Sequence, residues 1–176
     1  MVIRDSDRRL RKLKLLISRT QNAANLGAVG GPGMSQRPVG PDLQLQAEWA
    51  RYICVLAAGF MERSLSAIYV EYIRTNSAGP ISKHGQFYAE RVPNAKAEQF
   101  VEIAKRFDPA WGQALDDFLA EDGRKDAIDS IVNNRNLIAH GGDSGITVAR
   151  VADYLDKCVR VLEFIENQCG LSITAP

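Results

Sequence analysis

Residues 133–142 read NNRNLIAHGG, and this stretch places three side chains that can act on an anion within six positions. Arg135 carries a permanent charge that forms paired contacts with phosphate oxygens, and His140 exchanges protons near neutral pH. The Asn136 amide can hold an imidazole or a phosphate oxygen in place. On a helix Asn136 and His140 share a face, and Arg135, about 100° round, is long enough to reach the same space. The three form a candidate site for phosphodiester chemistry.

The same stretch also has a purely structural interpretation. Gly141 and Gly142 would stop the helix, and polar residues gather at helix ends because the last backbone carbonyls lack partners. An Arg-Asn-x-x-x-His hexapeptide arises by chance in roughly one chain in a hundred of this length. Its position at a helix end, after an apolar stripe and before two glycines, favours the functional interpretation.

RNA is a substrate that fits these groups, because its 2′-hydroxyl is itself the nucleophile. A base and a cation then suffice without a metal ion. His84 and His140 are the two histidines of the chain, and no carboxylate or cysteine cluster stands at metal-ligand spacing, so we expect no metal and no cofactor. His84 is interpreted as a loop residue. Transesterification needs both a base and an acid, which a two-fold dimer with two copies of Arg135 and His140 would supply.

Composition sets the class of protein. The chain of 176 residues suits one domain spanning 1–176, and its 45% apolar and 24% charged residues are typical of a globular protein. The net charge of +1 argues against a uniformly basic nucleic-acid binder, so any anion site is local. Three cysteines, Cys54, Cys158 and Cys169, lie in apolar helical sequence and are expected to be reduced core thiols. With no signal-peptide pattern and no uninterrupted apolar stretch near eighteen residues, we expect a cytoplasmic protein without a membrane span.

Helical periodicity dominates the chain, and no alternating strand pattern occurs. The pattern predicts helices near residues 4–20, 42–76, 94–107, 109–121, 125–140 and 148–168, with a turn at 77–85. Asn94, Asp108 and Thr147 are the expected N-caps of three of them. The last helix has a stripe predicted to be buried, formed by Val148, Val151, Leu155, Cys158, Leu162 and Ile165. The fold class is therefore all-α, an up-and-down helical bundle.

Two segments near the N-terminus have distinctive compositions. Residues 4–20 predict a basic amphipathic helix, whose charges are either a solvated face on a packed helix or a contact surface for RNA or a partner. Residues 25–42 contain five glycines and three prolines and predict a long mobile loop. Its GAVGGPG run is not a phosphate loop, because no Lys-Ser/Thr follows and no strand precedes it.

Glu62 is a fourth candidate site residue. It lies within about 60° of Val55, Ala58, Leu65, Tyr69 and Ile73 on the long central helix, so it falls on an apolar stripe. Desolvating an unpaired carboxylate costs several kcal/mol, roughly, so Glu62 either meets a cation or reaches a wet cleft. Arg135 is one candidate partner.

The hexapeptide RNLIAH is similar to the Arg-Asn, three residues, His signature of HEPN domains. Four further stretches resemble the RiboL-PSP type of that family, from residue 43 onward: GFMERSL (59–65), PNAKAEQFVEIAKRFDPAW (93–111), AIDSIVNNRNLIAHG (127–141) and DSGITVARVADY (143–154). The resemblance implies a four-helix core with flanking helices, and a homodimer that joins two motifs in one cleft. It also implies metal-independent RNA cleavage that leaves a 2′,3′-cyclic phosphate and a 5′-hydroxyl.

Carried over by position, the resemblance implies that Arg135 binds the scissile phosphate, that His140 is the acid/base and that Asn136 orients them. Glu62 is an auxiliary candidate that rests on the stripe argument, since some HEPN nucleases have an acidic group near the motif. The resemblance also implies a defence or toxin-antitoxin setting, with an antitoxin or other protein as a partner. Two alternatives stay open: a non-enzymatic HEPN module that dimerises or binds RNA or a partner, and a DNA-binding helical regulator acting through residues 4–20.

Overall fold

The computed structural model describes residues 2–26, 43–92 and 95–171 of the chain. Seven α-helices and no strand occur in these ranges, which confirms the all-α fold class. The helices are α1 (Val2–Leu26), α2 (Leu43–Asn76), α3 (Gly79–Ala89), α4 (Ala97–Phe107), α5 (Pro109–Ala120), α6 (Arg124–Ala139) and α7 (Val148–Gln168).

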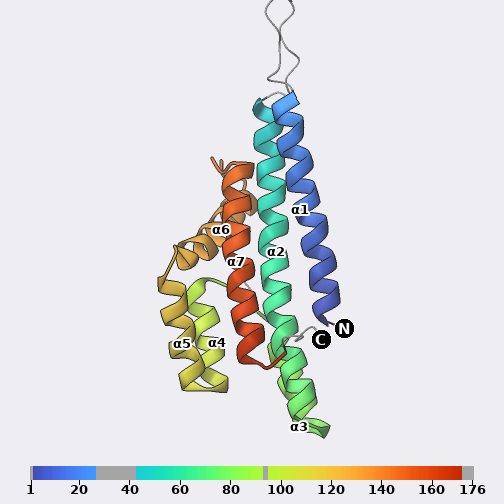
Figure 1. Cartoon of the computed structure of the whole chain (residues 1–176), viewed down its shortest axis with the longest axis vertical. Helices are drawn as coiled ribbons and strands as arrows, with labels where there is room; N and C mark the ends of the chain where they lie inside the picture. Colours follow the sequence, from blue (N-terminus) through green and yellow to red (C-terminus); the bar gives the residue numbers. More distant parts are fainter. Residues whose placement is uncertain (1, 27–42, 93–94, 172–176) are drawn as a thin grey trace, which may run out of the picture.

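Four helices share a core. Helices α1, α2 and α7 lie side by side along the long axis of the molecule, and α6 crosses against α2 and α7 (Figure 1). Their directions alternate in chain order, so the bundle runs up and down as predicted. Helices α4 and α5 form a hairpin beside this core, while α3 contacts α2 and no other helix of the described chain.

Helix α2 is the central helix because one of its faces meets α1 and others meet α6 and α7. Ile53, Cys54, Ala57, Met61 and Leu65 are fully buried along it. By length and mean hydropathy Gln44–Asn76 is apolar enough to cross a membrane, but 56% of the window that meets this criterion is buried inside the protein. Burial of that kind is typical of a core helix.

The predicted stripe of α7 is confirmed, except that Val148 is half-buried rather than buried. The predicted basic helix packs in the same way: Leu13 and Ile17 are buried, and Lys14 forms a surface ion pair with Asp156 on α7 (2.9 Å). The three cysteines are free and buried, as expected. Burial raises the pKa of the Cys54 thiol to about 11, so it remains protonated near neutral pH.

Two of the expected N-caps are present. The Asp108 carboxylate accepts a hydrogen bond from the Ala110 amide (2.8 Å), and the Thr147 hydroxyl accepts one from the Arg150 amide (3.3 Å). Helix α4 begins differently. Its first amide, that of Ala97, donates to a carboxylate oxygen of Asp129 on α6 (2.9 Å), and α4 starts three residues later than predicted. The predicted cap Asn94 lies outside the described residues.

The prediction of a turn at residues 77–85 is wrong, because α3 occupies most of that range. Gly79 adopts a left-handed φ of 62° at the start of α3, and Pro80 lies in its first turn. The backbone N–H groups of a first turn have no partner within the helix, so proline, which lacks an N–H, costs no hydrogen bond there. The first helix is also longer than predicted, since α1 reaches Leu26. The rest of the predicted loop, with its GAVGGPG run, lies outside the described residues.

Candidate functional site

The end of α6 presents the motif residues. His140 is the last residue of the helical path, and Gly141 follows with a left-handed φ of 75°. The Gly141 amide donates to the Ile138 carbonyl (3.0 Å) and the Gly142 amide donates to the Leu137 carbonyl (2.8 Å). These two bonds form a Schellman motif. The two glycines therefore end the helix, as the purely structural interpretation of this stretch predicts.

A second constraint acts at Gly142. A Cβ added there would lie 2.4 Å from the Leu137 Cδ1 atom and 3.1 Å from the Leu137 carbonyl oxygen. The chain therefore folds back tightly over the last turn of α6, which holds His140 at the turn rather than within the helix.

Arg135 contacts both Asn136 and Glu62 near this end. Its Nη1 donates to Oδ1 of Asn136 (2.9 Å), and its Nη2 lies 3.9 Å from Oε2 of Glu62 on α2. The side chains of Arg135 and Glu62 are 32% and 18% exposed, so water reaches this contact between α6 and α2. Arg135, the candidate partner of Glu62, therefore does meet it, at the long limit of an ion pair.

His140 is exposed. Its backbone amide donates to the Asn136 carbonyl (3.1 Å), and its imidazole has no hydrogen-bond partner among the described residues. Asn136 therefore orients Arg135, and not His140, in the single chain. The structure brings Arg135, Asn136 and Glu62 together and leaves the imidazole of His140 open to solvent one helical turn further on.

The loop after the glycines is fixed by polar contacts that sequence reasoning missed. Arg51 on α2 forms an ion pair with Asp143, and a second with Glu48 (2.8 Å). The Ser144 hydroxyl donates to Oδ1 of Asn134 (2.7 Å). Asn134 lies inside the motif stretch, so the sequence could have indicated it as a site residue. Nothing in the local spacing points to Arg51, which lies 92 residues from Asp143.

Cavities near the loop do not include the candidate site. One of about 620 Å³ opens between α1, α2 and the 144–149 segment, where Thr20, Gln46 and Ile146 are among its lining residues. None of Arg135, Asn136, His140 or Glu62 lines it. The four candidate residues lie outside this cavity, and His140 is the exposed one among them while the other three are half-buried.

Exposed apolar side chains also lie on α2, the helix that carries Glu62. We call Leu45, Trp49, Tyr52, Val55 and Leu56 the α2 stripe; between 38% and 53% of each is exposed. At 100° per residue Val55 is about 20° from Glu62 and Tyr52 about 80° from it, so the stripe continues round α2 from the Glu62 face. Leu137 on α6 is 44% exposed as well.

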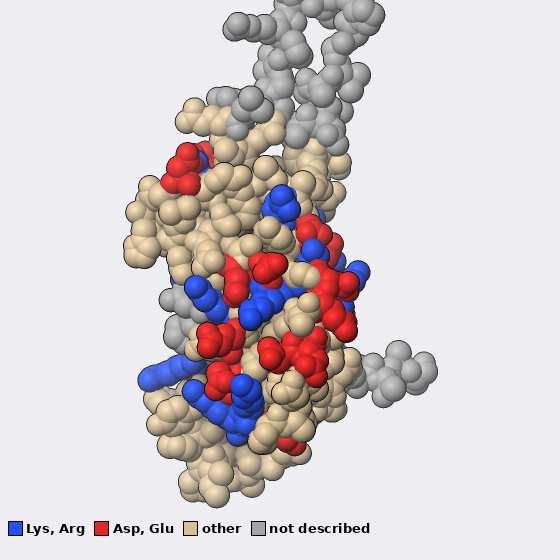
Figure 2. Space-filling view, turned by 90° about the vertical axis from the view of Figure 1, so that its left-hand side faces the viewer, with Lys and Arg blue, Asp and Glu red and all other residues tan. Residues whose placement is uncertain are grey.

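Away from the motif, acidic and basic side chains are mixed rather than gathered into a patch of one sign. On the face formed by α4, α5 and α6, acidic and basic side chains are interleaved (Figure 2). Within the described ranges, no three His, Cys, Asp or Glu residues gather as a metal-ligand group. The arrangement at the end of α6 supplies a cation held by an amide and a carboxylate, together with an exposed imidazole.

Comparisons with known proteins give one result. The family model described as RiboL-PSP-HEPN matches residues 8–170, which is most of the chain and includes the motif. No curated protein and no solved structure gives a significant match.

Proposed function

Since the chain belongs to the RiboL-PSP-HEPN family, a HEPN family, we propose that it is an endoribonuclease that cleaves RNA by 2′-hydroxyl attack. Membership of a HEPN family indicates a nuclease or an RNA-binding type of module. The observation that carries the proposal is the cluster of Arg135, Asn136 and Glu62 beside the exposed His140. A cation positioned by neighbours next to an accessible base is what phosphodiester cleavage requires.

In this proposal each residue has one role. Arg135 binds the scissile phosphate and stabilises its developing charge, and Asn136 and Glu62 act as positioning residues that hold the guanidinium. His140 takes the proton of the 2′-hydroxyl as that oxygen forms a bond to phosphorus. A second acid gives a proton to the departing 5′-oxygen, so the products are a cyclic phosphate and a 5′-hydroxyl.

The second acid is the reason for a dimer. One chain supplies a single histidine at the motif, so the His140 of a second copy is the group proposed to protonate the leaving oxygen. The α2 stripe supports this arrangement, because exposed Trp49, Tyr52 and Leu56 lie on the helix that carries Glu62. Aromatic and aliphatic residues of this kind are enriched in the centres of protein interfaces.

A cleavage assay with chelator tests the chemistry. Because the proposed nucleophile belongs to the substrate, cleavage of single-stranded RNA is expected to continue in excess EDTA. A DNA strand of the same sequence lacks the 2′-hydroxyl and is expected to remain intact. Activity that disappears with EDTA and returns with magnesium would refute the mechanism, as would cleavage of the DNA strand.

The alternative proposal is a non-enzymatic HEPN module that dimerises and binds RNA or a protein. One observation favours it: Arg135 already contacts Asn136 and Glu62, and this is also what a structural arginine does. The two proposals differ in the assay above. RNA binding without any cleavage, by protein shown to be dimeric, would select the module.

The biological setting is a further part of the proposal. We infer a cytoplasmic toxin or defence effector that acts with an antitoxin or similar protein partner, because the family resemblance implies that setting. Expression of the chain is then expected to arrest bacterial growth, and expression of the His140→Ala variant is not. Equal growth of both strains at equal protein levels would remove this inference.

A further inference from the structure

A second hollow lies at the opposite end of α2 from the motif loop. It has a volume of about 500 Å³, within the range of small-molecule sites, and opens between α3, α4 and the last turns of α2. Helix α3 contacts α2 and does not contact α4, so the hollow lies between α3 and α4, and residues of α2 complete its lining. Neither the motif residues nor Glu62 line it.

Aromatic rings form much of the hollow. Tyr69 and Phe107 are stacked (ring centroids 4.8 Å apart), and Tyr72 meets Phe107 edge to face (5.6 Å). Tyr88, from α3, also lines the hollow and is 64% exposed. Exposed flat rings that line an open space are suited to hold another flat ring by stacking.

The charges of the hollow have one sign. Arg91 and Arg106 line it, and no Asp or Glu does. The Arg106 guanidinium has no ion-pair partner among the described residues, and Arg91 lies over the Phe87 ring (4.0 Å to the centroid). Two arginines without an acidic neighbour in the lining complement an anion.

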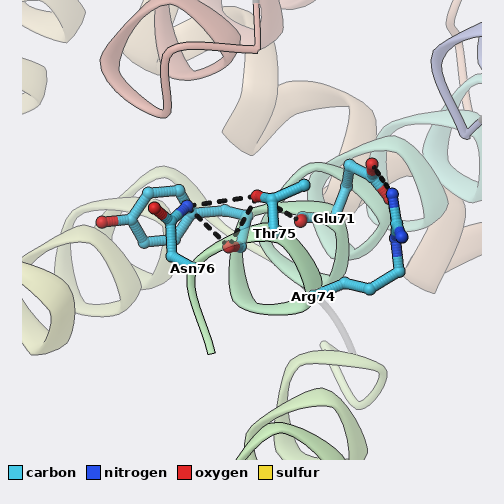
Figure 3. A network of polar contacts seen from close by, with 5 residues as sticks. Glu71, Arg74, Thr75 and Asn76 are labelled. Atoms are coloured by element: carbon cyan, nitrogen blue, oxygen red, sulfur yellow. Dashed lines mark hydrogen bonds and ion pairs between the residues drawn. The ribbon is translucent and has the colours of Figure 1, made fainter. Parts of the chain in front are cut away.

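Hydrogen-bonding groups stand at the rim. Asn76 donates through Nδ2 to the Tyr72 carbonyl (2.9 Å) and to the Thr75 hydroxyl (3.1 Å), which fixes its amide at the end of α2 (Figure 3). Its Oδ1 atom has no partner among the described residues. Arg74, on the same turn, is instead held by two hydrogen bonds to Glu71 and does not line the hollow (Figure 3).

We propose that this hollow binds a nucleotide, with its base against the rings of Tyr72 and Tyr88 and its phosphate at Arg91 and Arg106. The required chemistry is a flat ring with hydrogen-bonding edges joined to an anion, which a nucleotide combines in one unit. A free mononucleotide and a nucleotide within an RNA strand share it. The proposal is independent of cleavage, because the hollow does not include the motif.

Tryptophan fluorescence measures this binding. Trp111 packs 5.3 Å from the Tyr72 ring and 6.5 Å from the Phe107 ring, both of which line the hollow, and Trp49 is the other tryptophan of the chain. In a Trp49→Phe background, adenosine and guanosine monophosphates are expected to change the fluorescence of Trp111 in a saturable way. Adenosine without phosphate is expected to bind at least about 10-fold more weakly.

Matched variants test the two arginines. Arg106→Gln and Arg91→Gln are each expected to weaken mononucleotide binding by about 10-fold or more, whereas Arg74→Gln, which removes a nearby charge outside the hollow, is expected to have no effect. Circular dichroism confirms that each variant is folded. The absence of saturable binding at concentrations of about 5 mM, or equal weakening by Arg74→Gln and Arg106→Gln, would overturn the proposal.

Two further arms identify the source of the nucleotide. A single-stranded RNA oligonucleotide is titrated against the same protein carrying His140→Ala, so that any cleavage is suppressed. Binding of the oligonucleotide that Arg106→Gln weakens assigns the hollow to RNA, and binding of the mononucleotide alone assigns it to a free ligand. Either result supports a nucleotide site. If neither the oligonucleotide nor the mononucleotide binds, the proposal is refuted.

Discussion

At the scale of single residues, the contact between Arg135 and Glu62 decides how the motif is held. The two charged atoms are 3.9 Å apart, and the side chains are 32% and 18% exposed, so water reaches both. An ion pair of this kind stabilises a protein much less than a buried one, because solvent screens the charges and the carboxylate is not stranded when the cation is removed.

We therefore expect Arg135→Ala to lower the free energy of unfolding by about 1 kcal/mol, compared with the roughly 3 to 5 kcal/mol lost from a fully buried pair. Urea denaturation measures the difference. Glu62→Gln is the matched variant and is expected to cost a similar amount, with the effects non-additive in the double variant because both remove one contact. A loss above about 3 kcal/mol in Arg135→Ala would show that the carboxylate is buried when unpaired.

At the scale of helices, the end of α6 positions His140 through backbone geometry. Gly141 has a left-handed φ that L-residues adopt at a cost, and the amides of Gly141 and Gly142 close the Schellman motif. The exposed imidazole gains its position from this turn, since no described side chain holds it.

A pair of glycine substitutions tests this role. Gly141→Ala is expected to lower the free energy of unfolding by about 1 to 2 kcal/mol, because alanine is strained at a φ of 75°. Thermal unfolding measures the cost, and cleavage assays measure the displacement of His140. Gly145→Ala is the control, since Gly145 has no positive φ and an added Cβ there meets nothing within 4 Å. Equal melting temperatures for the two variants would contradict the account of the turn.

At the scale of the whole molecule, the single chain leaves both the apolar α2 stripe and the imidazole of His140 exposed. A dimer would cover the first and provide a second copy of the other. Stable interfaces bury at least about 1,000 Å² in total and centre on aromatic and aliphatic side chains, which the α2 stripe supplies.

A charged residue within the stripe is expected to separate the two copies. Tyr52→Glu should shift the protein from dimer to monomer in light scattering and abolish cleavage, since a buried unpaired carboxylate disfavours the interface. Leu15→Glu is the control, because Leu15 is 51% exposed on α1 and lies outside both the α2 stripe and the aromatic hollow. A monomeric wild-type protein with full activity would refute the shared site.

Mixing two inactive proteins tests whether the site is shared. His140→Ala and Arg135→Ala homodimers are each expected to lose cleavage by a factor of about 100 to 10,000. A heterodimer of the two keeps one histidine and one arginine on opposite chains, so some activity is expected to return if one of each suffices.

The other outcomes of the mixing experiment are distinct. If both copies of each residue are required, no activity returns, and a wild-type chain paired with a mutant chain is inactive as well. A site within one subunit gives no rescue in the mixed mutants but about half of the activity in the wild-type heterodimer. That last pattern would overturn the composite site.

The sequence by itself determined the features that depend on near neighbours in the chain. Helical periodicity predicts the buried stripe of α7, Asp108 and Thr147 predict the caps of two helices, and the glycine pair predicts the end of α6. Each of these rests on residues a few positions apart, whose relative placement the helix itself fixes. The turn expected at 77–85 fails for the same kind of reason, because Gly79 and Pro80 serve equally well to begin a helix.

The tertiary structure decided which distant groups meet. The stripe argument placed Glu62 among apolar residues, but the crossing of α6 over α2 is what brings Arg135 within 3.9 Å of it and Arg51 to Asp143. The structure also shows that the Asn136 side chain hydrogen-bonds to Arg135 rather than to His140. It places α3 and α4 apart, which leaves the aromatic hollow between them. Helix directions and crossing angles follow from the packing of whole faces, which no local spacing encodes.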